Sequence, residues 1–328
     1  MNESKPKLGV YWAASCGGCD VSLLGIHEQI LELVDAAEIA FWPAATDFKY
    51  QDLKNLSSNE LTVTLFNGAL RSSENEEMAH LLREKSEVLV GFGSCACQGG
   101  IPGLANLANR EEVFDRAYLD NPTTSNPDGV VPAEEVELNG ELVTLPKFYD
   151  RVSTLASKVE VDYQLPGCPP PPNLVQEFVS AFISGDMPEP GTVLGEQKTV
   201  CDQCDREWEK ETIEEFRRPH EADIDGDRCL LDQGIICMGP ATRGGCEARC
   251  PDANMPCTGC FGPPPRVKDQ GTEMMNSLAS ILQTGPEEGN LDRERAILDQ
   301  LPDPAGTFYR FSLPSSILGG RVEGDEPS

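Results

Sequence analysis

The sequence has few histidines, few basic residues relative to acidic ones, and no long apolar run. Its three histidines show no pairing with a serine or cysteine nucleophile in a supporting context, so a hydrolytic triad is not indicated. The phosphate-binding pattern GxxxxGK[ST] is absent, and no GxGxxG opens a helix after the first expected strand, which leaves nucleotide binding with little support. The chain also lacks an apolar stretch of about 18 residues, so a membrane-spanning helix is not expected.

Charge and targeting signals narrow the choice of partners. The N-terminus MNESKPKLGV has neither the basic-then-apolar layout of a secretory signal nor a twin-arginine pair, so we expect a cytoplasmic protein. Lys and Arg number 26 against 55 Asp and Glu, a formal charge of −29. Such a surface repels nucleic-acid phosphates and anionic lipid, so neither nucleic acid nor membrane is an expected partner. Acidic residues gather in 111–120 and 132–141, which we interpret as a solvated insertion.

Cysteine is the residue type in excess. The chain has 13 cysteines, and in a reducing cytoplasm this density indicates metal binding rather than disulfides. The number corresponds to three sets of four with one thiol left over.

The first half of the sequence alternates apolar runs with helical patterns. Residues 20–37, 73–85 and 173–184 have apolar side chains at three- and four-residue spacing, which predicts helices. Ser73 followed by Glu76 resembles a capping box at the start of the second helix. Repeated strand–helix units predict a flavodoxin-like, doubly wound parallel α/β domain over residues 1–190. The strands that we expect are 8–14, 38–43, 61–68, 87–93 and 159–167.

Four cysteines follow three of these strands. Cys16 and Cys19 come after the first strand, Cys95 after the fourth and Cys168 after the fifth. Because the carboxyl ends of parallel strands share one edge of a sheet, we expect the four thiols to meet there. The glycines in GSC and PGC allow sharp turns whose N–H groups can point at an anionic cluster.

Other interpretations of the first pair remain open at this point. A CxxC at a helix start after a strand is also typical of thioredoxin-like redox motifs, which do not need Cys95 and Cys168. Structural zinc usually takes its ligands from two nearby knuckles, whereas these four cysteines span some 150 residues.

The composition changes at about residue 191, where we place a second domain, 191–328. Its cysteines lie among Gly and Pro with few aliphatic residues, so metal–thiolate bonds are the natural source of its folding energy. By count alone the thiols suit two zinc sites or two iron–sulfur clusters equally. Two short amphipathic helices, 273–283 and 293–301, precede an acidic tail. The eight cysteines are Cys201, Cys204, Cys229, Cys237, Cys246, Cys250, Cys257 and Cys260.

The motifs CGGCDVSLLG, GSCACQGGIPG and PGCPPPP, in this order, resemble the proximal-cluster signature of nickel–iron hydrogenase small subunits. CLLDQGIICMGPATRGGC and PCTGCFGP are similar to the C-terminal cluster region of that family. The likeness is greatest to the gamma subunit of the cytoplasmic methyl-viologen-reducing (deazaflavin-non-reducing) type, and it covers about residues 8–280. The resemblance implies an oxidoreductase subunit with no substrate chemistry of its own. The resemblance further implies that the subunit relays electrons from a nickel–iron large subunit to a small iron–sulfur subunit and a heterodisulfide reductase-type flavoprotein complex.

The resemblance also assigns ligands for three 4Fe–4S clusters. Cys250 serves as a fourth ligand, which makes the medial cluster 4Fe–4S rather than 3Fe–4S. Cys16, Cys19, Cys95 and Cys168 match the proximal set, Cys246, Cys250, Cys257 and Cys260 the medial set, and Cys201, Cys204, Cys229 and Cys237 the distal set.

Three questions stay open on the sequence alone. Cys97, two residues after Cys95, is the spare thiol; in an extended loop the two side chains would point to opposite sides. A complex-I-type quinone oxidoreductase small subunit is an alternative, although such proteins typically have two adjacent cysteines and one cluster. The non-enzymatic alternative is a zinc-stabilised scaffold.

Overall fold

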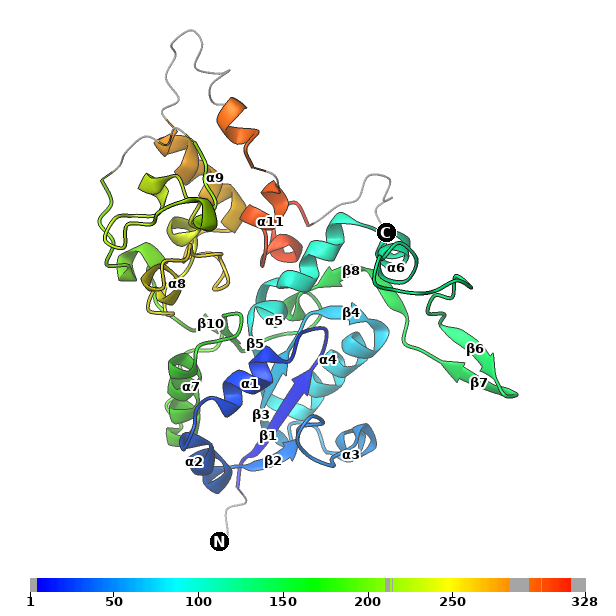
Figure 1. The fold of residues 1–328 in the computed structure, drawn as a ribbon. Coiled ribbons are helices and arrows are strands. Elements are labelled where there is room, and N and C mark those ends of the chain that lie inside the picture. The colour runs from blue at the N-terminus through cyan, green and yellow to red at the C-terminus, as the bar shows by residue number, and fades with distance from the viewer. Residues whose placement is uncertain (1–4, 210–212, 214, 283–294, 302, 320–328) are drawn as a thin grey trace.

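A six-stranded parallel sheet forms the centre of the N-terminal part of the molecule (Figure 1). The computed structural model describes residues 5–209, 213, 215–282, 295–301 and 303–319, which include all thirteen cysteines. The strand order is β10-β9-β5-β3-β1-β2, the flavodoxin-like order with one strand added at the edge. The strands are β1 (Lys7–Trp12), β2 (Glu38–Phe41), β3 (Leu61–Asn67), β5 (Ser86–Phe92), β9 (Tyr163–Leu165) and β10 (Thr192–Val193). The predicted fold class is therefore confirmed.

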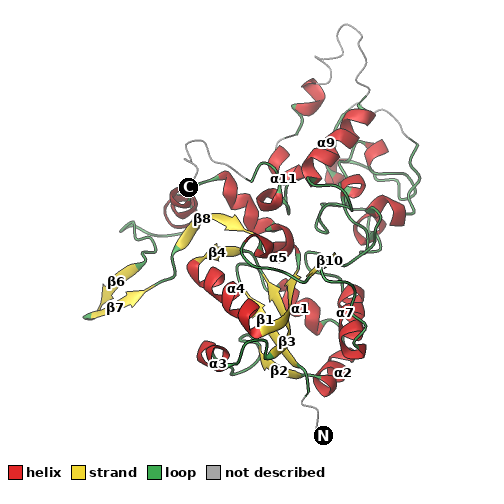
Figure 2. Cartoon of the chain, turned by 180° about the vertical axis from the view of Figure 1, so that it is seen from behind, coloured by secondary structure: helices red, strands yellow, loops and turns green. Residues whose placement is uncertain are grey.

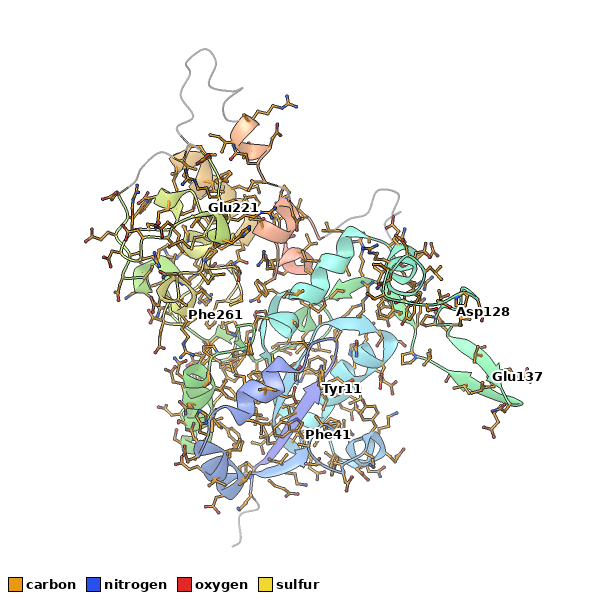
Figure 3. The ribbon with its side chains drawn as sticks, viewed as in Figure 1. Tyr11, Phe41, Asp128, Glu137, Glu221 and Phe261 are labelled. Carbon is orange, nitrogen blue, oxygen red and sulfur yellow. The ribbon has the colours of Figure 1, made fainter. Side chains whose placement is uncertain are left out.

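Helices cover both faces of this sheet. On one face α1 (Gly18–Leu24), α2 (Gln29–Ala36) and α7 (Pro172–Ser184) pack over strand residues such as Val10. On the other face α3 (Tyr50–Asn55) and α4 (Ser73–Lys85) cover an aromatic core that contains Tyr11 and Phe41, both labelled in Figure 3. Both faces are thus buried, as the apolar runs predicted.

Two local predictions were wrong. The single helix expected over residues 20–37 is two helices, because the chain turns at Gly25 and His27 takes a left-handed conformation with φ 55°. The capping residue of α4 is Ser72 rather than Ser73. The Ser72 hydroxyl accepts a hydrogen bond from the N–H of Asn75, whose side-chain oxygen accepts one from the N–H of Ser72.

The acidic insertion forms an arm, residues 111–145, that projects from the sheet domain in both views (Figures 1 and 2). It contains most of α6 (Arg110–Phe114), a π-helical turn (Asp115–Leu119), and a hairpin of β6 (Glu135–Leu138) and β7 (Glu141–Thr144). Every residue of both hairpin strands is exposed, so the insertion is solvated as predicted. The chain returns to the body through β8 (Phe148–Ser153), which pairs with β4 (Leu70–Ser72).

The region after β10 has little regular structure. The longest element is α9 (Gln270–Ile281), which matches the helix predicted over 273–283. Of the helix predicted over 293–301, residues 295–298 are helical and 293–294 lie outside the described residues, as does the acidic tail from residue 320. The shorter elements are η4 (Val200–Gln203), η5 (Pro219–Glu221), η6 (Leu231–Gln233), η7 (Gly239–Ala241), α8 (Arg249–Asp252), α11 (Pro304–Phe308) and η8 (Leu313–Ser315).

This region packs directly onto the sheet domain. Phe261, labelled in Figure 3, is buried in the same apolar core as Val10 and the residues of α7. The division into two domains at residue 190 stays a prediction. Within the described part of the chain, no helix is both long enough and apolar enough to cross a bilayer.

A buried carboxylate fixes the loop between β1 and α1. The two oxygens of Asp20 accept hydrogen bonds from Trp42 Nε1 at 2.7 Å and from Asn67 Nδ2 at 2.6 Å. Asn67 Oδ1 in turn accepts a hydrogen bond from the Ser15 hydroxyl at 2.8 Å. Asp20 and Asn67 are both buried, so this network ties residues 15–20 to the end of β3.

We expect Asp20→Ala to lower the urea midpoint of unfolding, because Trp42 Nε1 and Asn67 Nδ2 would each lose a buried acceptor, at about 1–3 kcal/mol per donor. Asp35→Ala is the matched control, since the Asp35 side chain is exposed and its ion pair with Lys5 is long, 3.8 Å. The two variants are compared by anaerobic urea titration. Equal midpoints would show that the network contributes nothing to stability.

Candidate metal centres

Three loops meet at the carboxyl edge of the sheet and bring Cys16, Cys19, Cys95 and Cys168 together. Cys16 precedes α1 and Cys19 lies in its first turn, Cys95 lies in α5 (Ser94–Gln98) after β5, and Cys168 follows β9. The loops after β5 and β9 are joined by main-chain hydrogen bonds, from Gly93 N to Leu165 O and from Ser94 N to Gly167 O, both 2.8 Å.

Electrostatics show how close these four thiols are. Burial raises the pKa of Cys95 to about 12, and repulsion from the ionised forms of Cys168 and Cys16 adds to the shift. Burial also raises the pKa of Cys19, with further contributions from Cys95 and Cys168. Cys19, Cys95 and Cys168 therefore lie within electrostatic range of one another, as do Cys16, Cys95 and Cys168. Ionising all four thiols requires a compensating positive charge.

Glycines leave the space around the sulfurs free. A Cβ on Gly93 would lie 2.3 Å from Cys19 Sγ, and one on Gly100 would lie 2.5 Å from Cys95 Sγ. Both glycines have positive φ, 86° and 59°, a conformation that other residues rarely adopt. Any side chain introduced at position 93 or 100 would collide with a cysteine sulfur, so only glycine fits at these two positions.

A second group of thiols forms in the C-terminal region, from Cys201, Cys204, Cys229 and Cys237. Desolvation raises the pKa of Cys201 to about 12, followed by repulsion from Cys237, Cys229 and Cys204. The pKa of Cys237 rises to about 11 through burial, although a backbone hydrogen bond from Gly239 opposes the shift. A Cβ on Gly239 would come within 2.9 Å of Cys201 Sγ.

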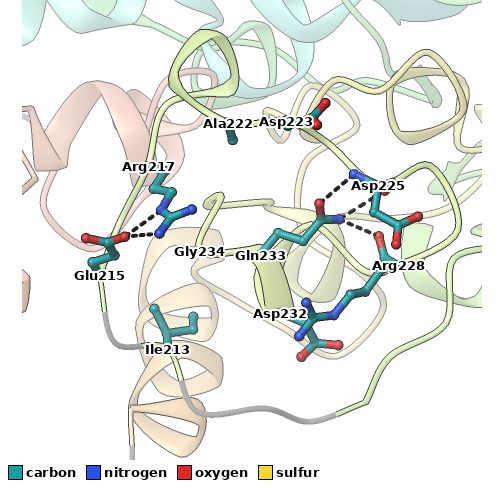
Figure 4. A pocket seen from close by; sticks show the side chains of 10 residues that line it. All are labelled: Ile213, Glu215, Arg217, Ala222, Asp223, Asp225, Arg228, Asp232, Gln233 and Gly234. Atoms are coloured by element: carbon teal, nitrogen blue, oxygen red, sulfur yellow. Dashed lines mark hydrogen bonds and ion pairs between the residues drawn. The ribbon is translucent and has the colours of Figure 1, made fainter.

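An open cavity of about 820 Å³ is lined in part by Arg228 and Asp232, which lie on either side of Cys229 in the sequence (Figure 4). Gln233 braces its wall: its Oε1 accepts a hydrogen bond from Asp225 N at 2.8 Å, and its Nε2 donates to Arg228 O at 2.8 Å. Arg217 pairs with Glu215 on the opposite side. No cysteine is among the described residues that line the cavity. We interpret Gln233 as the residue that shapes the loop leading to Cys229.

The third group contains Cys246, Cys250, Cys257 and Cys260. Burial raises the pKa of Cys260 to about 12, and repulsion from Cys246 and Cys250 is among the other causes. The pKa of Cys257 is raised by burial and then by repulsion from Cys237 and Cys260. Cys257 therefore lies between its own group and the group of Cys237.

The three groups are in contact end to end. A backbone hydrogen bond from Cys168 lowers the pKa of Cys260, and the two thiols also repel each other. The Ser94 hydroxyl donates to the carbonyl of Cys260. At the other end, Cys257 N donates to Cys237 Sγ at 3.3 Å. The group of Cys246 therefore lies between the other two.

Cys97 occupies a different environment from Cys95. It is buried, and its Sγ donates a hydrogen bond to Gly91 O at 3.2 Å. Residues 94–98 are helical, so the extended-loop geometry assumed for Cys95 and Cys97 was wrong. All thirteen cysteines are free thiols. No three His, Cys, Asp or Glu side chains of the described ranges converge on a position for a single metal ion.

Several residues that shape the sites were not singled out from the sequence. Asp20 and Asn67 support the first CxxC, and a feature of the sequence could have indicated each of them. Asn67 is a polar residue ending an apolar strand, and Asp20 falls on the expected buried side of a helix. Gln233 gave no such signal, because its partners are backbone atoms of a loop.

Comparison with known proteins places the chain in a family. Residues 16–182 match the family model described as NADH ubiquinone oxidoreductase, 20 Kd subunit. The iron-sulfur subunit of the F420-non-reducing hydrogenase of Archaeoglobus profundus is 37% identical over 96% of this chain and 98% of its own length. The matching subunit of the F420-non-reducing hydrogenase of Methanothermobacter marburgensis is 38% identical over 97% of this chain and 98% of its own.

A solved structure supports the fold. A chain of the Dm. baculatum [NiFeSe]-hydrogenase superimposes with a TM-score of 0.50 at 18% identity, covering 80% of this chain and 96% of that one. At this identity the likeness concerns the fold alone. The full-length relatives carry the assignment: the chain belongs to the family of nickel–iron hydrogenase small subunits represented by these F420-non-reducing hydrogenase subunits, and it is part of an oxidoreductase complex.

Proposed function

We propose that this chain is the electron-relay subunit of a cytoplasmic hydrogenase complex and that it holds three 4Fe–4S clusters. Residues 1–190 carry the proximal site and residues 191–328 the other two. The proposed ligands are Cys16, Cys19, Cys95 and Cys168 (proximal), Cys246, Cys250, Cys257 and Cys260 (medial), and Cys201, Cys204, Cys229 and Cys237 (distal).

The observation that carries this proposal is the serial contact of the thiol groups. Cys168 lies against Cys260, and Cys257 donates a backbone hydrogen bond to Cys237 Sγ. Stepwise electron transfer needs centres in such a row, whereas independent structural metal sites do not.

The donor set also fits iron–sulfur clusters. Thiolates are the ligands of such clusters, and hydrogen bonds to sulfur are among the features that set their potentials. Backbone N–H groups already point at these sulfurs: Gly239 at Cys237, and Gly259 at Cys257. When bound, each cluster supplies one-electron oxidation and reduction. The chain's own contribution is to hold the sulfurs, limit water and aim the N–H dipoles.

The two ends of the row face different partners in this proposal. Around the first CxxC the large apolar side chains of Trp12, Val21 and Leu24 are 46%, 67% and 56% exposed, a composition typical of a protein interface. We assign this surface to the nickel–iron large subunit. At the distal end we place a small iron–sulfur subunit and a heterodisulfide reductase-type flavoprotein complex. Relatives named as F420-non-reducing are consistent with an acceptor other than F420.

Two other functions make different predictions. The matched family model is named for a quinone-reducing complex. Small subunits of that type typically have two adjacent cysteines, whereas this chain has CGGC. They also hold one cluster, which leaves the eight C-terminal cysteines without a use. A zinc scaffold would use the same thiols without electron transfer.

Metal analysis separates the relay from the scaffold. Protein purified without oxygen is expected to contain about twelve iron and about twelve sulfide per chain, in line with three four-iron clusters. Absorbance and electron paramagnetic resonance of the reduced protein provide the second readout. A colourless protein that contains zinc and is magnetically silent contradicts the proposal.

Cys95 and Cys97 form a matched pair for the ligand assignment. Cys95→Ser is expected to remove up to about four iron atoms per chain, because a 4Fe–4S cluster uses four thiolates. Cys97→Ser is expected to retain the wild-type iron content, since the Cys97 thiol is engaged with Gly91 O. Iron is counted in both purified variants. A loss of iron in Cys97→Ser equal to that in Cys95→Ser contradicts the assignment.

Interrupting the middle of the row tests the relay itself. In the assembled complex, Cys260→Ala is expected to lower hydrogen-dependent reduction of the acceptor complex by more than about tenfold, while hydrogen–deuterium exchange, which needs only the large subunit, continues. The two activities are measured on one preparation, with Cys97→Ala as the control. Unchanged acceptor reduction despite loss of medial iron contradicts the relay.

A further inference from the structure

The arm, residues 111–145, contributes no residue to the buried core of the described chain. Every residue of β6 and β7 is exposed, and Figure 3 shows Glu137 on the hairpin and Asp128 beside it, away from the sheet. An isolated two-stranded hairpin is marginally stable in water. Such a hairpin gains stability when another surface covers it.

The two faces of the hairpin differ in chemistry. The pairing places Val136 opposite Val143 and Leu138 opposite Glu141. Val136, Leu138 and Val143 therefore share one face with Glu141. The three apolar residues of this face are 51%, 58% and 44% exposed. The other face carries Glu135 and Glu137, with Leu142 and Thr144 opposite them.

The arm is held firmly at its base. Phe148, just after the arm, packs on Phe114 with ring centroids 5.2 Å apart, and Arg71 lies over the Phe148 ring at 4.5 Å. Within the arm, Asn126 braces the loop before β6: its Nδ2 donates to Val130 O at 2.7 Å, and its Oδ1 accepts from Val130 N at 3.0 Å. These contacts anchor the base of the arm and order the loop before the hairpin, which lowers the entropy that docking would cost.

Charge identifies the kind of surface that can receive the arm. It contains nine acidic residues and one basic residue, Arg116, a formal charge of −8. A second copy of the same arm is repelled, because like charges oppose each other across an interface. A groove with apolar side chains for Val136, Leu138 and Val143, and with Lys or Arg for Glu141 beside them, is complementary.

The position of the arm relative to the thiol groups indicates which partner offers this groove. In both Figures 1 and 2 the arm projects on the side away from residues 195–282, which carry the medial and distal thiols. An acceptor docked at the distal end is therefore remote from the arm. The proximal end is connected to it: η1 (Ile101–Leu107) begins beside Gly100, which contacts Cys95, and ends near α6 at the base of the arm. Ile101 and Leu107 are both 52% exposed, so exposed apolar residues extend from the proximal site toward the arm.

We propose that the arm clasps the hydrogenase large subunit, inserting the Val136–Leu138–Val143 face into an apolar groove rimmed by basic residues. This inference rests on the proposed function, because it takes the large subunit as the partner at the proximal end. The arm supplies binding and orientation, while the surface around the first CxxC supplies the contact through which electrons enter.

Leu138 and Leu142 allow a matched test, because they are leucines of similar exposure, 58% and 66%, on opposite faces of one hairpin. The full chain is tagged, co-produced with the large subunit and purified without oxygen. The large subunit retained is measured over a dilution series. We expect Leu138→Ser to weaken retention of the large subunit about tenfold, because the proposed complex buries this leucine side chain. We expect Leu142→Ser to change retention less than about twofold. Glu141→Gln, on the same face as Leu138, is expected to reduce the salt dependence of binding.

The outcomes distinguish the two proposals. Iron content equal to wild type in each variant shows that the chain has folded around its clusters. Equal retention for Leu138→Ser and Leu142→Ser at every dilution and salt concentration overturns the role of the arm. If the wild-type chain itself retains no large subunit, the proposed function fails as well.

Discussion

Gathering sulfur anions in a desolvated space is the constraint on which this structure depends. Four thiols in one group raise one another's pKa, as Cys168 and Cys16 do to Cys95, so the ionised set needs both a metal and hydrogen-bond donors. The donors are main-chain N–H groups, and a main chain that aims them at sulfur cannot also use them in a helix or sheet. This accounts for the short turns of residues 195–265 and for the glycines at 93, 100 and 239, where a Cβ would meet a sulfur.

The same constraint joins the two halves of the chain. Cys168 on the sheet edge interacts directly with Cys260 in the irregular region. Two further contacts hold the loop of Cys260 against the sheet domain: the Ser94 hydroxyl donates to the carbonyl of Cys260, and Phe261 is buried in the core under α7. Burial of an apolar side chain next to Cys260 thus helps to position the thiols of the C-terminal region.

Much of this could be read from the sequence. The buried strands were predicted from continuous apolar runs, and α4 was predicted from apolar residues that recur with the 3.6-residue period of a helix. The meeting of Cys16, Cys95 and Cys168 at one edge follows from parallel topology. The break between α1 and α2 was missed because it depends on a left-handed His27, which no pattern marks. The strand β10 has two residues and no periodicity to detect. The grouping of the last eight cysteines came from family resemblance, since spacing cannot say which loops a tertiary fold brings together.

Surface charge and apolar exposure together limit what this chain can bind. With a formal charge of −29, two copies of the chain repel each other within a Debye length, about 8 Å in physiological salt. This repulsion opposes self-association through exposed apolar residues such as Val21 and Leu138. A partner surface with Lys and Arg side chains removes this repulsion, and charge complementarity then adds to the burial of the same apolar residues. An acidic chain with apolar contact points therefore discriminates among partners through repulsion as much as through fit. Under the proposed function this discrimination matters, because a chain that carries electrons loses them to any suitable acceptor that can approach.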